Sequence, residues 1–285
     1  MSTLSVLLQY LLPHHALSRF TALFAESALL KNLLIGSFIR RYRVDLADAL
    51  VTDPKAFENF NDFFTRELKP GARPLPEGSD AVVSPADGTV SQAGTISGKV
   101  LLQAKGRFFE LAELLGGNTA LAEQFHDGSF ATIYLSPRDY HRVHMPLAGR
   151  LEKMIYVPGR LFSVNPRTTE KVSGLFARNE RVVCVFHTAA GPMAVIMVGA
   201  MIVAGIETVW SGTVCPSSGT RIIRETDFDN RSPPIELAMG AEMGRFKLGS
   251  TAIVLFGAGA VELVSEIKAE AAVQMGQPLG KVRDA

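Results

Sequence analysis

The amino-acid sequence predicts an α+β fold in which N-terminal amphipathic helices pack on a largely antiparallel β-sheet core. Apolar residues recur at helical spacing through residues 17–43, and short β-branched runs with alternating spacing dominate after residue 80. Between these two regions, residues 69–78 are rich in proline and glycine, which marks the best internal boundary. We therefore expect a helical segment over residues 1–68 and a β-rich domain over residues 69–285.

The first 43 residues are both apolar and basic. Five basic residues stand against the single acid Glu26, so this segment has a formal charge of +4, whereas the whole chain carries only +1. The first apolar run ends at Pro13 after about three helical turns, which is too short to cross a bilayer. A basic, apolar helix fits a position in the membrane interface. The alternative is a helix pair packed on the body of the protein or on a second subunit.

The remaining elements follow in order along the chain. Helix is expected to continue through residues 44–68, where Asp53 caps a first turn that contains Pro54 and four phenylalanines form a core-facing stripe. The polar residues 216–245 are expected to be rich in loops, and helices are expected at 108–115 and 119–125. Strands are predicted over residues 81–84, 89–91, 100–102, 129–135, 149–157, 181–187, 193–205 and 251–256.

Composition excludes several classes of function. A net charge of +1 gives no global basic field, so we expect no nucleic-acid partner. The two cysteines, Cys184 and Cys215, are too few for a disulfide framework and are expected to be reduced thiols in a cytosolic compartment. The pair His141 and His144 lacks further ligands at metal-site spacing, so no metal is expected.

A Gly-Ser pair, Gly249-Ser250, stands directly before the buried strand expected at 251–256. Glycine has no side chain, so its carbonyl is open to attack by the hydroxyl of a following serine once a base removes the proton. Attack would give an ester in place of the peptide bond. β-Elimination would then cut the chain and leave a ketone at the new N-terminus. Taken alone, such a pair is more commonly an ordinary turn before a strand.

A serine nucleophile needs a base and a group that orients the base. The informative histidines are His141 and His144, in a segment where arginines, an aspartate and a tyrosine crowd between apolar strands. Such clustering fits a cleft for an anionic substrate, although two polar histidines at a strand–turn junction are the commoner case. Asp87 is the best orienting carboxylate, but Asp-Gly is also an ordinary hairpin turn. Nothing in the spacing joins Asp87, His144 and Ser250.

Five motifs carry a family resemblance. They are Ser84-Pro85-Ala86-Asp87-Gly88, Tyr140-His141-Arg142-Val143-His144-Met145-Pro146, Phe162-Ser163-Val164-Asn165, Phe176-Ala177-Arg178-Asn179-Glu180-Arg181 and Leu248-Gly249-Ser250-Thr251. Together, and in this order, they resemble the bacterial, membrane-associated phosphatidylserine decarboxylases over about residues 57–257. The resemblance implies a proenzyme that cuts itself at Gly249–Ser250 into a β chain, residues 1–249, and an α chain, residues 250–285.

The resemblance also implies a role for each matched residue. Asp87, His144 and Ser250 match the self-cleavage triad of orienter, base and nucleophile. Ser250 would become a covalent pyruvoyl group, the cofactor, whose carbonyl forms a Schiff base with the amine of phosphatidylserine and accepts electrons as CO2 leaves. His141 matches the histidine thought to act on the substrate during decarboxylation.

The lipid substrate sets the expected partners and location. Arg138 and Arg142 are chemical candidates for binding the lipid phosphate. An enzyme that acts on a head group must sit at a membrane lipid surface, so we expect peripheral attachment to the cytoplasmic side of the inner membrane. The α and β chains come from one proenzyme, and a homodimer of this αβ unit is one option.

Two alternatives stay open at this point. The chain could be a decarboxylase of another serine-headed lipid. It could instead be a non-catalytic carrier, because residues 85–90 also resemble hairpins of biotinyl or lipoyl domains. Such domains present a modified lysine at a hairpin tip, and no lysine here has clearly matching flanks.

Overall fold

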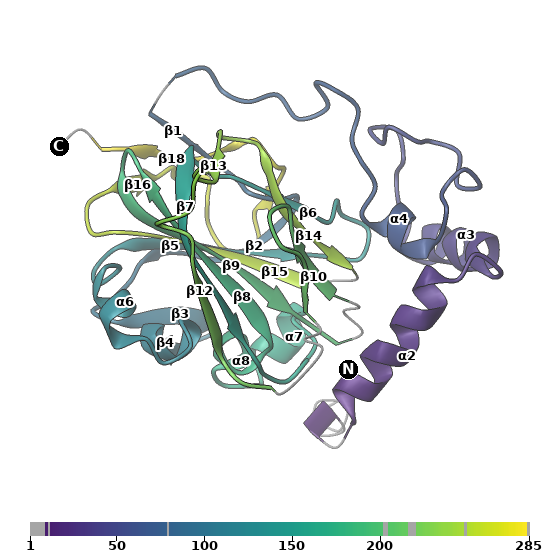
Figure 1. Ribbon diagram of the computed structural model, residues 1–285, viewed down its shortest axis with the longest axis horizontal. Coiled ribbons are helices and arrows are strands. Elements are labelled where there is room, and N and C mark those ends of the chain that lie inside the picture. Colours follow the sequence, from purple (N-terminus) through teal and green to yellow (C-terminus); the bar gives the residue numbers. More distant parts are fainter. Residues whose placement is uncertain are drawn as a thin grey trace.

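A nine-stranded antiparallel sheet forms the centre of the protein (Figure 1). The computed structural model describes residues 9–10, 12–78, 80–201, 205–215, 221–247 and 250–283. In spatial order the strands of the central sheet are β12 (Arg224–Asp227), β7 (Gly149–Val157), β8 (Arg181–Thr188), β9 (Gly191–Gly199), β15 (Ser250–Phe256), β5 (Ser129–Leu135), β2 (Gly88–Thr95) and β17 (Ala272–Val273), and β13 (Glu236–Leu237) also pairs with β7.

Strand β15 lies in the middle of this sheet and is buried along its whole length. Its seven residues pair with β9 on one side and with β5 on the other. Ile253 and Leu255 pack into the core on one face, and Val254 and Phe256 pack into the core on the opposite face. Burial of each such side chain stabilises the fold by about 1.5–3 kcal/mol. The run is apolar without alternation because both faces of the sheet are covered.

Short helices and a hairpin cover the first face. Apolar side chains such as Leu114, Leu121 and Phe176 pack there against the sheet. In Figure 1 these elements lie below the sheet. They are β3 (Val100–Ala104), β4 (Arg107–Glu110), α5 (Leu111–Leu114), α6 (Thr119–Glu123), α7 (Pro166–Thr169) and α8 (Leu175–Arg178).

Two smaller antiparallel sheets cover the second face, where Val143, Phe246 and Leu279 join the core. One contains β11 (Gly212–Cys215), β10 (Gly205–Thr208), β14 (Glu242–Lys247) and β6 (Arg142–His144) in that order. The other contains β1 (Ala81–Val83), β18 (Pro278–Val282) and β16 (Val261–Leu263). The α+β, mainly antiparallel fold class is therefore confirmed.

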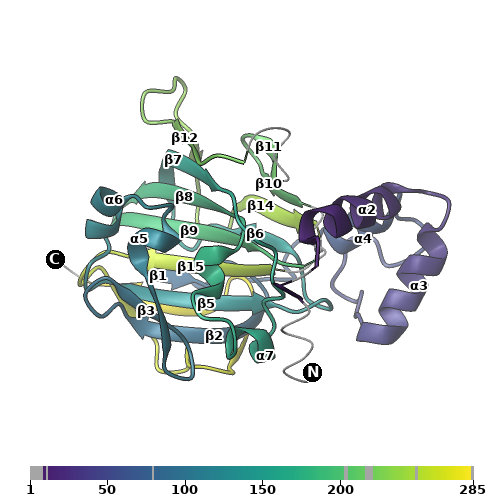
Figure 2. The same cartoon turned by 90° about the horizontal axis from the view of Figure 1, so that it is seen from below.

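The N-terminal helices form an arm beside the sheets. They are α2 (His14–Glu26), α3 (Lys31–Tyr42) and α4 (Phe60–Phe64). Figure 2 shows them grouped next to β6, β10 and β14. Phenylalanines 57, 60, 63 and 64 are buried together, which confirms that this stripe is core. In the part of the chain that the structure describes, no single helix could cross a membrane, although α2 and α3 reach the required length and hydropathy together with a bend of 112°.

Three local predictions are wrong. Only α4 is helical within residues 44–68, because the Asp53 carboxylate accepts the Lys55 amide at 2.9 Å and closes a turn instead of capping a helix. The helix expected from residue 108 begins at Leu111, since the preceding residues pair with β3. The strand expected over residues 193–205 ends at Gly199, and a separate strand, β10, begins at Gly205. The segment 216–245 is loop-rich as expected: its described residues 221–245 are mostly loop around β12, β13 and the start of β14, and residues 216–220 lie outside the described residues. The expected cap of α6 is confirmed, because Asn118 accepts the Leu121 amide at 2.9 Å.

Candidate active site

Ser250 is the first residue of β15 and is enclosed by its neighbours. Its backbone pairs with Leu135 of β5 on one side and with Gly199 of β9 on the other. The side chain is fully buried, and Oγ has no hydrogen-bond partner among the described residues. A buried hydroxyl without a partner costs free energy, so such a group calls for an explanation. Gly249, the other half of the predicted cleavage site, lies outside the described residues.

His141 lies just before β6 and is also fully buried. Its Nδ1 lies 2.8 Å from the Asp139 carbonyl oxygen, which can only accept, so Nδ1 carries the proton. Nε2 is then an acceptor, and it has no partner in the described part of the chain. Burial lowers the pKa of His141 to about 3, so the ring is neutral at pH 7. The Phe64 ring lies 3.9 Å from the imidazole, centroid to centroid, and covers it.

His144 ends β6 and is held at both ring nitrogens. Nδ1 lies 2.8 Å from the Gly240 carbonyl oxygen, so it donates there, and Nε2 accepts from the Tyr140 hydroxyl at 2.9 Å. The backbone amide of His144 donates to the Pro85 carbonyl at 2.8 Å, which joins β6 to the turn before Asp87. Burial lowers the pKa of His144 as well. The ring is a neutral base whose lone pair is occupied by Tyr140.

Asp87 binds an arginine and a backbone amide. Arg73 donates from Nε at 3.0 Å and from Nη2 at 2.6 Å, and the Met275 amide donates at 2.8 Å. These hydrogen bonds with Asp87 are the main reason that the pKa of Arg73 is raised. No hydrogen bond joins Asp87 to His144 among the described residues, although the Asp87 charge is close enough to raise the pKa of His144 in small part.

The pairing register of β14 and β6 determines how far each histidine lies from Ser250, measured along β14. The Phe246 amide donates to the His141 carbonyl at 3.0 Å, four positions before Ser250. Glu242 pairs with His144, eight positions before Ser250. At about 3.3 Å per residue, the two pairing points on β14 are about 13 Å apart. His141 therefore lies nearer the Ser250 end of β14, and neither imidazole is hydrogen-bonded to the serine in the described structure.

The two predicted phosphate ligands differ in their surroundings. Arg142 is nearly buried; its Nε donates to the Thr65 carbonyl at 2.8 Å, and its Nη1 donates to Glu67 and Glu242. Arg138 is exposed, and its Nε lies 3.8 Å from Asp139. Asp87 and Arg138 line a polar cavity of about 310 Å³. His144 and Arg142 line a second of about 290 Å³, and Arg73 and Tyr140 border both.

Comparison with known proteins places the chain in a family. A family model described as phosphatidylserine decarboxylase matches residues 60–281. The chain belongs to the phosphatidylserine decarboxylase family. A second model, described as PSD, matches residues 4–43, a range that includes α2 and α3 of the helical arm.

Curated members of the family align along nearly the whole chain. The phosphatidylserine decarboxylase proenzyme of Ectopseudomonas mendocina (strain ymp) is 58% identical over 283 residues, which cover 98% of both proteins. The proenzyme of Bordetella avium (strain 197N) is 58% identical over 273 residues, covering 95% of this chain and 92% of that protein. This similarity favours the decarboxylase interpretation over the carrier alternative.

The sequence did not predict two residues, Arg73 and Tyr140, as parts of the site in this member of the phosphatidylserine decarboxylase family. Arg73 lies in the Pro/Gly-rich linker, where an arginine gives no signal that it will bind Asp87. Tyr140 stands inside the histidine motif, and its spacing of four from His144 was the only clue to their contact. Within the described ranges, no three His, Cys, Asp or Glu side chains converge to form a metal site.

Proposed function

We propose that this chain is a proenzyme that cuts itself between Gly249 and Ser250 and then decarboxylates phosphatidylserine to phosphatidylethanolamine and CO2. One observation carries the proposal: in a chain of this family, the Ser250 Oγ is buried at the start of the central strand and has no hydrogen-bond partner among the described residues. Self-cleavage would put this hydroxyl to use.

The cleavage balances without an external oxidant or reductant. Ser250 Oγ gives up its proton and bonds to the Gly249 carbonyl carbon as the peptide C–N bond breaks, and the nitrogen keeps its own proton and gains a second one, which makes it a free amine. Loss of the Ser250 Cα proton then breaks the Cβ–Oγ bond, and the oxygen leaves on the Gly249 carboxylate. Water replaces the nitrogen of the resulting enamine as ammonia, which leaves a ketone at position 250.

His144 is proposed to take the Oγ proton, with Asp87 supporting the charge that the imidazole gains. The Tyr140 hydroxyl occupies the His144 lone pair, so this role requires that contact to open. The negative charge of Asp87 acts on His144 through space and raises its pKa in small part. The two hydrogen bonds from Arg73 hold the Asp87 carboxylate in place. Arg73 and Tyr140 are thus positioning residues around the proposed base.

The site at Ser250 is suited to a covalent pyruvoyl group, because Ser250 Oγ and His141 Nε2 are both buried and neither has a hydrogen-bond partner in the described part of the chain. Such a group supplies an electron sink when the substrate loses CO2. His141 Nε2 is the proposed atom that hands a proton to the substrate carbon. Because burial lowers the pKa of His141 to about 3, the ring would hold that proton only beside an anionic substrate group.

The helical arm is the proposed membrane surface. Apolar side chains on and between α2 and α3 are unusually exposed, including Leu23 at 71%, Leu29 at 93% and Leu33 at 64%. Arg40 and Arg41 lie in the last turn of α3. Apolar and basic side chains together fit an arm in the head-group region of an anionic bilayer, on the cytoplasmic side of the inner membrane. Residues 1–68 and 69–285 would then divide membrane contact from chemistry.

Aromatic contacts also connect the helical arm to His141. An apolar groove of about 380 Å³ between α2 and α3 is lined by Phe24, Phe38 and Phe60. Phe38 and Phe60 contact Phe64, which covers His141. A lipid bound at the arm would therefore lie one aromatic layer from the proposed acid.

A direct assay tests the proposed reaction. Purified, processed protein is given phosphatidylserine in detergent micelles, and CO2 release and phosphatidylethanolamine are measured together. We expect equal amounts of the two products and none from protein carrying Ser250→Ala. Processed protein that ignores phosphatidylserine but decarboxylates another serine-headed lipid would establish the alternative substrate instead.

A further inference from the structure

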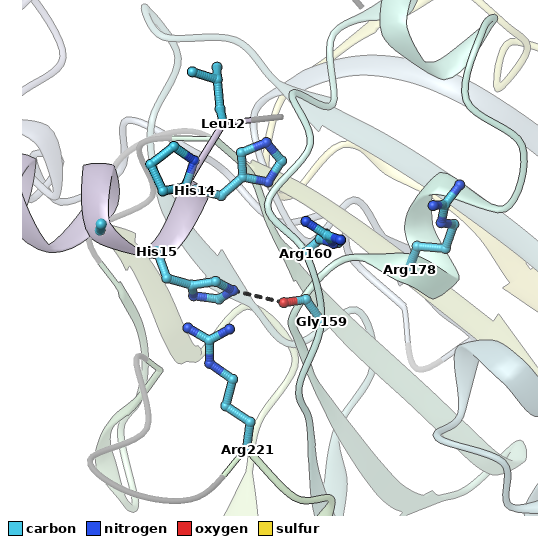
Figure 3. Close-up of a pocket in the computed structure, with 9 residues that line it drawn as sticks. Leu12, His14, His15, Gly159, Arg160, Arg178 and Arg221 are labelled. Carbon is cyan, nitrogen blue, oxygen red and sulfur yellow. Dashed lines mark hydrogen bonds between the residues drawn. The ribbon is translucent and has the colours of Figure 1, made fainter. Parts of the chain in front are cut away.

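A large cavity lies between the start of α2, the loop that follows β7, the end of α8 and the segment that precedes β12 (Figure 3). Its volume is about 750 Å³. It does not include Ser250, His141, His144 or Asp87. The residues that line it are Leu12, Pro13, His14, His15, Ala16, Gly159, Arg160, Arg178 and Arg221.

The lining of this cavity is positively charged. Arg160, Arg178 and Arg221 contribute three guanidinium groups, and no described carboxylate lines the cavity or pairs with them. Two aromatic rings hold the Arg178 side chain: its guanidinium carbon lies 5.5 Å from the Tyr10 ring centre and 5.3 Å from the Phe162 ring centre. In Figure 3 the Arg221 guanidinium approaches His15 from below. Three guanidinium groups around one space, with no carboxylate partner among the described residues, favour an anionic ligand.

His14 adds a buried donor with no partner. Its side chain is only 3% exposed, and Nδ1 accepts the Leu161 amide at 3.2 Å. The proton of the neutral ring is therefore on Nε2, which has no hydrogen-bond partner among the described residues. Burial lowers the pKa of His14, the backbone of Gln9 partly opposes this, and the Arg160 charge lowers the pKa further. An acceptor atom in the cavity would satisfy this N–H group.

The start of α2 points the same way. This helix has 13 residues, begins at His14, and has neither a side-chain cap nor an acidic residue in its first turn. The free N–H groups and the dipole of such an end favour negative charge. His15 is held in the cavity wall, where its Nε2 lies 2.9 Å from the Gly159 carbonyl oxygen.

Apolar surface borders the cavity on the side of the arm. Leu12, which lines it, is 37% exposed, and Tyr10 and Leu17 are 40% and 37% exposed. A free anion would gain nothing from these side chains. A lipid head group would place its phosphate among the arginines and leave its acyl chains along α2.

We propose that this cavity binds the phosphate of an anionic phospholipid at the membrane surface. The assignment to a lipid rests on the proposed membrane role of the arm. The cavity lies close behind the proposed catalytic serine, because Leu161, which binds His14, packs beside Gly199, the pairing partner of Ser250. An occupied cavity would hold α2 and the Ser250 edge of the sheet together at the bilayer.

The test uses full-length protein carrying Ser250→Ala, so the result does not depend on cleavage or turnover. Arg160→Gln with Arg221→Gln is compared with a control that removes the same charge elsewhere, Arg231→Gln with Lys268→Gln. Binding is measured to phosphatidylcholine vesicles that contain phosphatidylglycerol or phosphatidylserine, and inorganic phosphate is titrated by calorimetry. His14→Phe tests the buried donor without changing the charge of the neutral ring.

We expect the cavity double variant to lose about tenfold or more in vesicle affinity, and the control to stay within about twofold. His14→Phe should weaken binding in the same direction. A loss confined to phosphatidylserine vesicles assigns the cavity to the substrate lipid, whereas a loss for both compositions assigns it to anionic phospholipid in general. Equal losses in both double variants would overturn the site. A loss of phosphate binding with unchanged vesicle affinity would overturn its assignment to lipid.

Discussion

Arg73 binds both carboxylate oxygens of Asp87, with Nε at 3.0 Å and Nη2 at 2.6 Å. The two side chains are only 9% and 12% exposed, so the pair is largely withdrawn from water. Arg73 also pairs with Asp48, at 2.8 Å, and so ties the segment before α4 to the turn that carries Asp87. The proposed orienting carboxylate is thus fixed by an arginine from the linker and not by the histidine that it is proposed to support.

Arg73→Met should therefore impair both folding and self-cleavage. The substitution leaves a nearly buried carboxylate without its cation, which costs about 3–5 kcal/mol of the free energy of unfolding. Denaturant unfolding measures that loss, and gel analysis of fragments over time measures cleavage. Arg150→Met is the matched control, because Arg150 pairs with Glu152 and Asp229 near the surface, where water screens the charges. Normal cleavage in a folded Arg73→Met protein would contradict the positioning role.

Replacing His144 or His141 with alanine should impair two different reactions. His144→Ala should block self-cleavage, because Ser250 loses its proposed base. His141→Ala should cleave but decarboxylate about 10²–10⁴-fold more slowly, since general acid–base assistance is typically worth that much. Fragment analysis and CO2 release are measured on the same preparations. If His141→Ala alone failed to cleave, the shorter path from His141 to Ser250 along β14 would make it the base.

The buried imidazoles should make the unprocessed protein sensitive to acid. The pKa of His141 is lowered to about 3 by burial, whereas an unfolded histidine titrates near about 6.5. Below that pH the unfolded chain takes up a proton that the folded ring cannot, so the free energy of unfolding falls as the pH drops from about 6.5 toward 3. The slope contributed by His141 is at most about 1.4 kcal/mol per pH unit.

Urea unfolding of Ser250→Ala protein at pH 5, 6 and 7 checks this expectation. The burial of His144 acts in the same direction, so a single substitution should remove only part of the slope. Adding His141→Gln should make the pH dependence shallower. An identical slope with and without His141→Gln would mean that the ring is accessible to protons in the folded state.

The two fragments should stay together after cleavage. Residues 250–285 supply β15, which is paired along seven residues with β9 and along seven with β5, and is buried on both faces. The same fragment supplies β16 and β18, and β18 pairs with β1 of the other chain. Native size-exclusion chromatography should therefore show one species, and denaturant should be needed to separate the fragments. A free α fragment under native conditions would contradict the described sheet.

Local signals explain which parts of the fold could be predicted. The unbroken apolar run of β15, the helical periodicity of α2 and α3 and the Asn118 cap each depend on neighbouring residues, and each was found. Strand β6 was missed because its three residues include Arg142 and His144, which are buried only with partners such as Glu242 and Gly240 from a distant segment. Tertiary partners, which local propensity does not encode, decide such a strand.

Prediction of the site from the sequence was limited by the same dependence on tertiary partners. Motif resemblance singled out Asp87, His141, His144 and Ser250, but not the contacts among them. The ring of Phe64 over His141, the hydroxyl of Tyr140 on His144 and the guanidinium of Arg73 on Asp87 arise only when four segments fold together. The cationic cavity at His14 has no local sequence pattern, because Arg160 follows β7, Arg178 ends α8 and Arg221 precedes β12.

Intact mass spectrometry of denatured, purified protein tests the central claim most directly. The account predicts two masses, a fragment of residues 1–249 with a normal carboxylate and a fragment that begins at position 250 with a pyruvoyl group and no amine. Ser250→Ala should give one uncut mass and no decarboxylation. A wild-type chain that stays whole after long incubation, and still releases CO2 from phosphatidylserine, would contradict the account.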